Sequence, residues 1–143
     1  MVGGQADDLS VENSPKTIDA LESIHRRKTG AMIRAALKMG GIAAGGTENQ
    51  LASLDEYGNN LGMAFQIVDD LLDYQGDSAT LGKSVGKDKA QGKLTFPGLL
   101  GVEESRRRAE SHIATATATL ESFEQQPADR LAALARYVVE RDH

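Results

Sequence analysis

Residues 61–77 read LGMAFQIVDDLLDYQGD, and the acids inside this stretch decide how the chain folds. On an α-helix each residue advances about 100°, so four polar side chains share one stripe about 100° wide: Gln66, Asp69, Asp70 and Asp73. The other positions are apolar: Leu61, Met63, Ala64, Phe65, Ile67, Val68, Leu71 and Leu72. A helix that is apolar nearly all round is a buried helix. Acids inside a buried helix are costly unless a cation pairs with them, so the stretch predicts a cation site.

A divalent metal, Mg²⁺, is the cation that the spacing favours. Asp69 and Asp73 are one turn apart, with Cβ atoms roughly 5–6 Å from each other. Short carboxylates at that spacing can hold Mg²⁺ from one side and leave positions for water and phosphate oxygens, which is usual for this ion. We therefore predict that Asp69, Asp70 and Asp73 are metal ligands. A solvated acidic face is the alternative that stays open, whereas acids placed by a helix dipole would lie at the start of the stretch, not late in it.

Length and composition restrict the class of protein. A chain of 143 residues, with 40% hydrophobic and 26% charged residues, is long enough for one globular domain. The formal net charge of −5 argues against general nucleic-acid binding, and the lack of cysteine excludes disulfides and thiolate metal sites. No apolar run is long enough to span a membrane, and the first ten residues do not resemble a signal peptide, so a cytoplasmic location is expected. Three prolines and few alternating β-branched residues favour an all-α fold.

Helix signals in the first half of the chain predict two long helical segments. One begins at the N-cap Thr17 and runs to about Thr29. Gly30 is a candidate break, and the pattern continues through residues 31–40. Lys28 lies beside that break.

A capping box begins the next helix. Thr47 and Gln50 have the required spacing, and the helix is expected to reach Tyr74 with the acid stripe in its second half. Gly58 and Gly62 weaken such a helix by up to about 1 kcal/mol each. Glycine at these positions indicates either close packing or the close approach of a ligand.

The second half contains a loop and three further helices. Residues 76–93 are a loop rich in glycine and lysine, and Pro97 is expected in the first turn of a short helix. A helix over 103–124 is broken by Pro127, and the last helix covers about 128–141. Apolar residues recur at helical spacing in both helices: Ala109, Ile113, Ala116 and Leu120 in the first, and Leu131, Leu134 and Val138 on one face of the second.

Lysines follow the acids closely. The loop 76–93 contains Lys83 and Lys93, and lysine is a flexible point charge that binds phosphate. Acids that hold Mg²⁺ next to a loop of this composition make a diphosphate site plausible, although the loop lacks the P-loop spacing. Upstream, residues 25–30 read HRRKTG and form a cationic run. The alternatives, a solvated surface loop and a solvated basic helix face, stay open on these residues alone.

The ordered set of motifs resembles a known family. FQIVDDLLD (65–73), GDSATLGKSVGKD (76–88) and GKLTFP (92–97), preceded by VGGQ (2–5) and HRRKTGAMI (25–33), are similar to the C-terminal half of trans-isoprenyl diphosphate synthases. The bacterial farnesyl diphosphate synthases are the most similar subgroup. The resemblance implies the all-α class I isoprenoid synthase fold, with residues 1–143 as a partial polyprenyl synthetase domain.

The resemblance also implies an activity and its residues. The family carries out a Mg²⁺-dependent, head-to-tail condensation of isopentenyl diphosphate with an allylic diphosphate, usually as a homodimer. By position in the motifs, the implied roles are metal binding for Asp69, Asp70 and Asp73; allylic diphosphate binding for Lys28, Lys83 and Lys93; and contact with the developing cation for Thr29 and Gln66. Lys28, Thr29 and Gln66 are the implied catalytic residues.

The first aspartate-rich motif of the family has no counterpart in these residues. Asp7 and Asp8 lack a third acid at helical spacing. Because the family mechanism needs two facing acid helices, we expect the 143-residue chain to be inactive alone. We also expect it to associate through exposed apolar surface. The length of the prenyl product cannot be inferred from these residues. Two alternatives remain: a non-catalytic or regulatory subunit that supplies a half-site, and a class I terpene cyclase, which the lysine-rich loop disfavours.

Overall fold

The computed structural model describes residues 16–80 and 94–141, and every regular element in these residues is a helix. This confirms the all-α expectation. The elements are α2 (Ile18–His25), the π-helical turn η2 (Arg26–Gly30), α3 (Ala31–Ala43), α4 (Glu48–Thr80), α6 (Phe96–Leu100), α7 (Val102–Ala118), the 3₁₀ turn η3 (Thr119–Ser122) and α8 (Gln125–Glu140). No helix in the described ranges is both long enough and apolar enough to cross a membrane.

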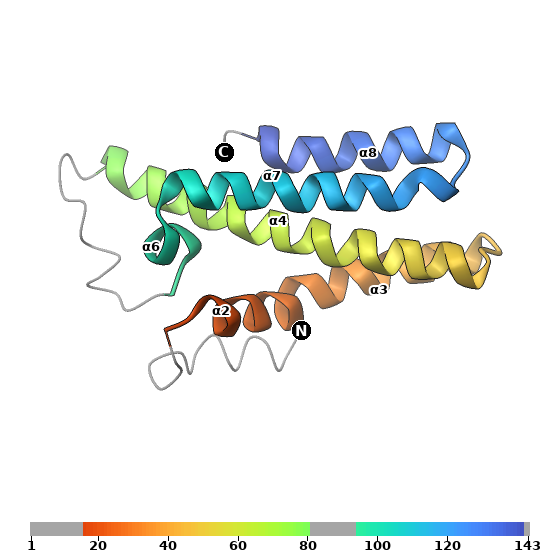
Figure 1. The fold of residues 1–143 in the computed structure, drawn as a ribbon, viewed down its shortest axis with the longest axis horizontal. Helices are drawn as coiled ribbons and strands as arrows, with labels where there is room; N and C mark the ends of the chain where they lie inside the picture. The colour runs from red at the N-terminus through yellow and green to blue at the C-terminus, as the bar shows by residue number, and fades with distance from the viewer. Residues whose placement is uncertain (1–15, 81–93, 142–143) are drawn as a thin grey trace.

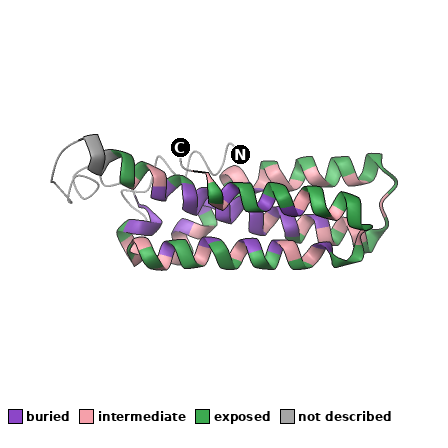
Figure 2. Cartoon of the chain, turned by 90° about the horizontal axis from the view of Figure 1, so that it is seen from above, coloured by how far each residue is buried: buried purple, intermediate pink, exposed green. Residues whose placement is uncertain are grey.

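Helix α4 is the central element of the bundle. It runs the length of the molecule with α2 and α3 on one side and α7 and α8 on the other (Figure 1). Tyr57 and Ile67 of α4 are fully buried, and they belong to two separate core clusters. Figure 2 shows the buried residues where the helices face one another and the exposed residues on the outer surfaces. The apolar positions predicted around the acid helix therefore do form the core.

Both predicted N-terminal caps are confirmed. The hydroxyl of Thr17 accepts a hydrogen bond from the backbone N–H of Ala20 at 3.3 Å. At the start of α4 the capping box is reciprocal, because the N–H of Thr47 donates to Oε1 of Gln50 at 2.9 Å and the N–H of Gln50 donates to the Thr47 hydroxyl at 3.3 Å. These bonds satisfy backbone donors that a helix start otherwise leaves unpaired.

The helix does not break at Gly30. Residues Arg26–Gly30 form one π-helical turn, and the flanking residues His25 and Ala31 keep helical backbone angles. The chain is therefore helical without interruption through α2, η2 and α3. A π turn widens the helix by one residue, and such turns are frequent at functional sites.

The C-terminal half differs from the sequence prediction in three details. Helix α4 runs beyond Gly76 to Thr80, so the loop starts later than expected. The helix before Pro127 ends by Ser122, and Pro127 lies in the first turn of α8, where its missing N–H costs nothing. In α8 the buried face is Ala132, Ala135 and Val138. Leu134, which helical spacing places on the same face as Leu131 and Val138, is 48% exposed, whereas the four apolar positions at helical spacing in α7 and η3 are all buried.

Candidate functional site

The polar stripe of α4 straddles the edge of the core. Gln66 is 7% exposed and Asp70 is 4% exposed, whereas the side chain of Asp69 is 52% exposed and Asp73 is also exposed. The expectation that all three acids are buried is therefore wrong for Asp69 and Asp73. The physical reason is that a stripe about 100° wide is broader than the seam between two neighbouring helices, so one side of it faces outward.

Arg141, which follows α8, is the cation beside Asp69. Its Nη2 lies 3.6 Å from Oδ1 of Asp69 and donates a hydrogen bond to the carbonyl oxygen of Phe65 at 3.1 Å. The guanidinium carbon lies 4.1 Å from the centroid of the Phe65 ring, a cation–π arrangement. Sequence reasoning missed Arg141, because a single arginine after an amphipathic helix belongs to none of the motifs that were recognised.

Asp70 is turned into the core, away from the exposed acids. Its Oδ2 accepts a hydrogen bond from the backbone N–H of Phe96 at 3.0 Å and lies 3.7 Å from Nε2 of His25. The His25 ring stacks on the Phe96 ring, with centroids 5.7 Å apart and planes inclined by 16°. Asp70 thus has partners from two other elements, α2 and α6.

Lys28, Thr29 and Gly30 of η2, here called the KTG turn, pack directly against α4, the acid helix. Lys28 and Thr29 are half-buried on η2, and Gly30 is buried. A β-carbon added at Gly62 of α4 would lie 2.8 Å from the Cα atom of Gly30, so the two backbones approach very closely. Of the two explanations for glycine at position 62, close packing is the one that the structure supports.

A bidentate ion pair between Arg34 and Asp55 links α3 to α4. Nε and Nη2 of Arg34 donate to the two carboxylate oxygens of Asp55 at 3.0 and 2.6 Å. These hydrogen bonds lower the pKa of Asp55 and raise the pKa of Arg34, with partial burial opposing both shifts. The pair fixes the register of the two helices that carry the KTG turn and the acids.

Two of the predicted diphosphate ligands, Lys83 and Lys93, lie outside the described residues. Among the residues that are described, there is no cluster of three or more histidine, cysteine, aspartate or glutamate side chains that could enclose a metal. Asp69 and Asp73 nevertheless suit Mg²⁺ chemically, because two exposed carboxylates one turn apart can hold it from one side. The remaining ligands would come from water and phosphate oxygens.

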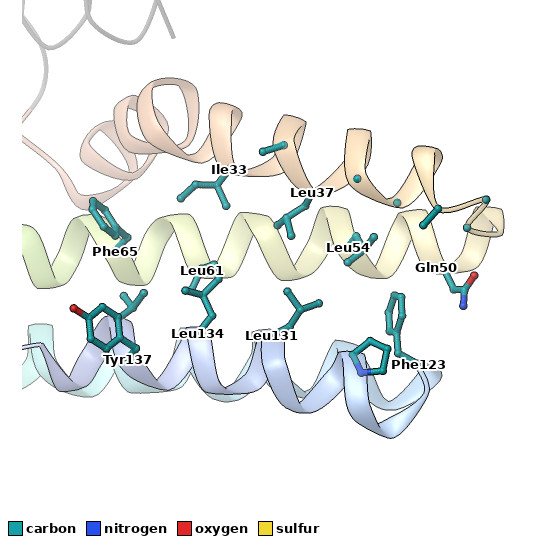
Figure 3. Close-up of a pocket in the computed structure, with 18 of the residues that line it drawn as sticks. Ile33, Leu37, Gln50, Leu54, Leu61, Phe65, Phe123, Leu131, Leu134 and Tyr137 are labelled. Atoms are coloured by element: carbon teal, nitrogen blue, oxygen red, sulfur yellow. The ribbon is translucent and has the colours of Figure 1, made fainter.

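An apolar groove of about 820 Å³ lies along the N-terminal half of α4. Residues of α3, α4 and α8 line it, and Figure 3 shows Ile33, Leu37 and Leu61 near its centre. Phe65 and Tyr137 lie toward one end (Figure 3), where Arg141 also contributes to the lining. Through Arg141, which contacts Asp69, this end of the groove adjoins the exposed acids.

Comparison with known proteins agrees with the arrangement of motifs. A family model described as "Polyprenyl synthetase" matches residues 1–130. The chain belongs to the polyprenyl synthetase family. Farnesyl diphosphate synthase of Escherichia coli (strain K12) is 47% identical to this polyprenyl synthetase chain over 145 residues, covering 99% of the chain and 48% of that protein. Farnesyl diphosphate synthase of Geobacillus stearothermophilus is 38% identical over 143 residues, covering 100% of the chain and 48% of that protein.

Solved structures give the same result for the fold. A farnesyl/geranylfarnesyl (FPP/GFPP) diphosphate synthase from Zymomonas mobilis superimposes with a TM-score of 0.80 at 35% identity, covering 96% of this polyprenyl synthetase chain and 45% of that one. A decaprenyl diphosphate synthase from Rhodobacter capsulatus gives a TM-score of 0.83 at 34% identity, covering 99% and 56%. All four of these proteins are named as synthases of prenyl diphosphates, and none of them as a terpene cyclase. The polyprenyl synthetase chain spans about half the length of the curated relatives it matches.

Proposed function

We propose that this polyprenyl synthetase chain supplies one wall of a prenyltransferase active site. The reaction is the Mg²⁺-dependent, head-to-tail condensation of isopentenyl diphosphate with an allylic diphosphate. The observation that carries the proposal is the outward-facing pair Asp69 and Asp73, which lies in the C-terminal half of α4, the same helix against which the KTG turn packs. If Asp69 and Asp73 were only a solvated acidic face, nothing would require the half-buried Lys28 and Thr29 on η2, which packs against the same helix.

The proposed roles follow from the chemistry of each side chain. Mg²⁺ bound at Asp69 and Asp73 would act as a Lewis acid on the diphosphate leaving group. Lys28, together with Lys83 and Lys93, would bind the diphosphate of the allylic substrate as point charges.

Two neutral groups are proposed to face the developing allylic cation. Thr29 lies on the half-buried face of η2, and Gln66 lies one turn before Asp70 on the buried side of the stripe. Their oxygen atoms carry partial negative charge, which stabilises a cation in a site from which water is excluded.

The chain alone offers a one-sided clamp for the metal. A full site needs a second set of acids across the diphosphate, which the relatives of twice this length have room to supply. We therefore propose that the 143-residue polypeptide is inactive alone, and that the working protein is a cytoplasmic homodimer in which both walls are present.

A chimera tests this function directly. The 143 residues replace the segment that they match in Escherichia coli farnesyl diphosphate synthase, and the purified protein is assayed with Mg²⁺, dimethylallyl diphosphate and isopentenyl diphosphate. We expect turnover in the chimera, and loss of turnover in the chimera carrying Asp69→Asn.

Asp129→Asn is the matched control, because Asp129 is an exposed acid on α8. It should leave the chimera as active as the parent. Equal turnover of the Asp69→Asn and Asp129→Asn chimeras would refute the metal site. Turnover by the 143-residue chain alone at the rate of a full-length synthase would refute the half-site.

A further inference from the structure

Asp70 has a different environment from the other two acids of its motif. It is 4% exposed, and its Oδ2 accepts the N–H of Phe96 at 3.0 Å. The same oxygen lies 3.7 Å from Nε2 of His25. A ligand to a metal held between the exposed Asp69 and Asp73 would have to face outward, and in that orientation it would abandon both partners.

His25, Asp70 and Phe96 form a polar cluster whose burial in this part of the core costs free energy. Neither ring nitrogen of the buried His25 has a hydrogen-bond partner among the described residues. Burying polar groups without hydrogen bonds costs free energy, and an apolar side chain stacked on Phe96 would avoid that cost. The polar cluster therefore calls for an explanation other than stability.

The three members of the cluster come from three elements: α2, α6 and α4. His25 is the last residue of α2, three positions before Lys28. Phe96 is the first residue of α6, three positions after Lys93. Asp70 follows Asp69 on α4, so one carboxylate contacts both α2 and α6.

We propose that Asp70 is a positioning residue and not a metal ligand. Its carboxylate holds the start of α6 and the end of α2 against α4, which fixes where Lys28, three residues after His25, stands relative to Asp69 and Asp73. The role of Asp70 in placing residues of the site rests on the proposed function, whereas its contacts with Phe96 and His25 do not.

Hydrogen–deuterium exchange on the full 143-residue chain tests the contact. Asp70→Ala removes the acceptor, so peptides that cover residues 94–100 and 26–30 should take up deuterium about tenfold faster, the loss of about 1.4 kcal/mol of local stability. Asp70→Asn keeps an oxygen that can accept from Phe96 and should exchange like the parent. Asp69→Ala, at the exposed neighbour, should leave both peptides unchanged.

Binding measurements on the same proteins separate positioning from ligation. Mn²⁺ alone is titrated and followed by water proton relaxation, and inorganic pyrophosphate is titrated in the presence of Mg²⁺ by calorimetry. Asp70→Asn should bind Mn²⁺ like the parent, whereas Asp69→Asn should bind it at least about tenfold more weakly. Asp70→Ala should weaken pyrophosphate binding about tenfold, and Asp70→Asn should restore it.

The outcomes are distinct. If Asp70→Asn weakens Mn²⁺ binding as much as Asp69→Asn does, Asp70 is a metal ligand and the proposal is wrong. Unchanged exchange in Asp70→Ala would also overturn it. If the parent binds no Mn²⁺, the proposed metal site fails, and the exchange data still decide whether Asp70 holds α6. If Asp70→Ala does not fold, Asp70→Asn alone separates ligation from positioning.

Discussion

Gly62 of α4 and Gly30 of the π-helical turn are in such close contact that a β-carbon at position 62 would lie 2.8 Å from the Cα atom of Gly30. The neighbour at that distance is backbone, which cannot rotate away as a side chain can. The KTG turn can rest on the acid helix this closely because position 62 lacks a side chain, whereas a β-carbon at Gly30 would meet only the carbonyl oxygen of His25, at 3.5 Å.

Gly62→Ala is therefore expected to be destabilising despite the better helix propensity of alanine. Overpacking against backbone should cost about 1–3 kcal/mol in the free energy of unfolding. Urea denaturation followed by circular dichroism measures the change. Gly40→Ala is the control, because nothing lies within 4 Å of the added carbon on α3. That variant should gain about 0.5–1 kcal/mol, and equal effects of the two substitutions would show that the crossing is not tight.

Lys83→Ala tests the lysine loop in the active chimera described above. A hydrogen bond to a charged group is worth about 1.5–3 kcal/mol, so the Michaelis constant for dimethylallyl diphosphate should rise about tenfold or more. Steady-state kinetics at saturating isopentenyl diphosphate give the value. Arg130→Ala, an exposed cation on α8, is the control for loss of a positive charge. An unchanged Michaelis constant in Lys83→Ala would mean that the loop is solvated surface.

Arg141→Gln should lower the stability of the chain by about 1–2 kcal/mol. The substitution removes the cation from the Phe65 ring and the bond to the carbonyl oxygen of Phe65, and it uncovers apolar surface that the arginine stem shields. Thermal unfolding measures the effect. Arg136→Gln, at an exposed position of α8, should change the midpoint very little. Similar losses in both variants would contradict a specific role for Arg141.

His112 should make stability depend on pH between pH 7.5 and mildly acidic values. Burial lowers the pKa of His112 below 6.5; Glu22 opposes this, and Arg26 and Arg108 reinforce it. Its Nδ1 also lies 2.9 Å from Oδ1 of Asn60. Because the folded-state pKa is depressed, the unfolded chain binds more protons below pH 6.5, so this contribution is present above pH 6.5 and is lost as pH falls toward the folded-state pKa.

Unfolding midpoints at a series of pH values check this expectation. The parent should lose stability on acidification through this range, and His112→Gln should lose less, because glutamine does not titrate. The other histidines remain in both proteins, so the difference between the two curves reports His112 alone. Parallel curves would contradict the assignment.

The apolar groove predicts that the 143-residue chain self-associates. Leu134 and Tyr137 are 48% and 65% exposed in its lining, and exposed apolar patches of this kind favour association. Light scattering should detect species larger than a monomer, and Leu134→Lys should shift the distribution toward the monomer. Ala133→Lys adds the same charge at an exposed position of α8 outside the groove and should have little effect. A monomeric parent would refute the prediction.

Features that depend on neighbouring residues in the same helix could be predicted from the sequence. The capping box of Thr47 and Gln50 forms as its spacing requires, and the period of α7 correctly identifies Ala109 and Ile113 as buried. Helical periodicity also correctly identified Met63, Ile67 and Leu71 of α4 as core residues. Each of these features is decided within a few turns of one helix.

Features that depend on distant partners were not predictable in the same way. Which side of the acid stripe is buried depends on Phe96, 26 residues away from Asp70, and the cation beside Asp69 comes from Arg141. The extent of burial of Leu134 depends on which helices pack against α8. The glycines at 58 and 62 were flagged by their propensity, but only the crossing with Gly30 explains position 62.

The 33 residues of α4 form a single unbroken helix about 50 Å long. Its N-terminal half borders the groove and holds Tyr57, and its C-terminal half carries Asp69, Asp70 and Asp73. One continuous helix therefore sets the spacing along the bundle between the apolar groove and the exposed acids.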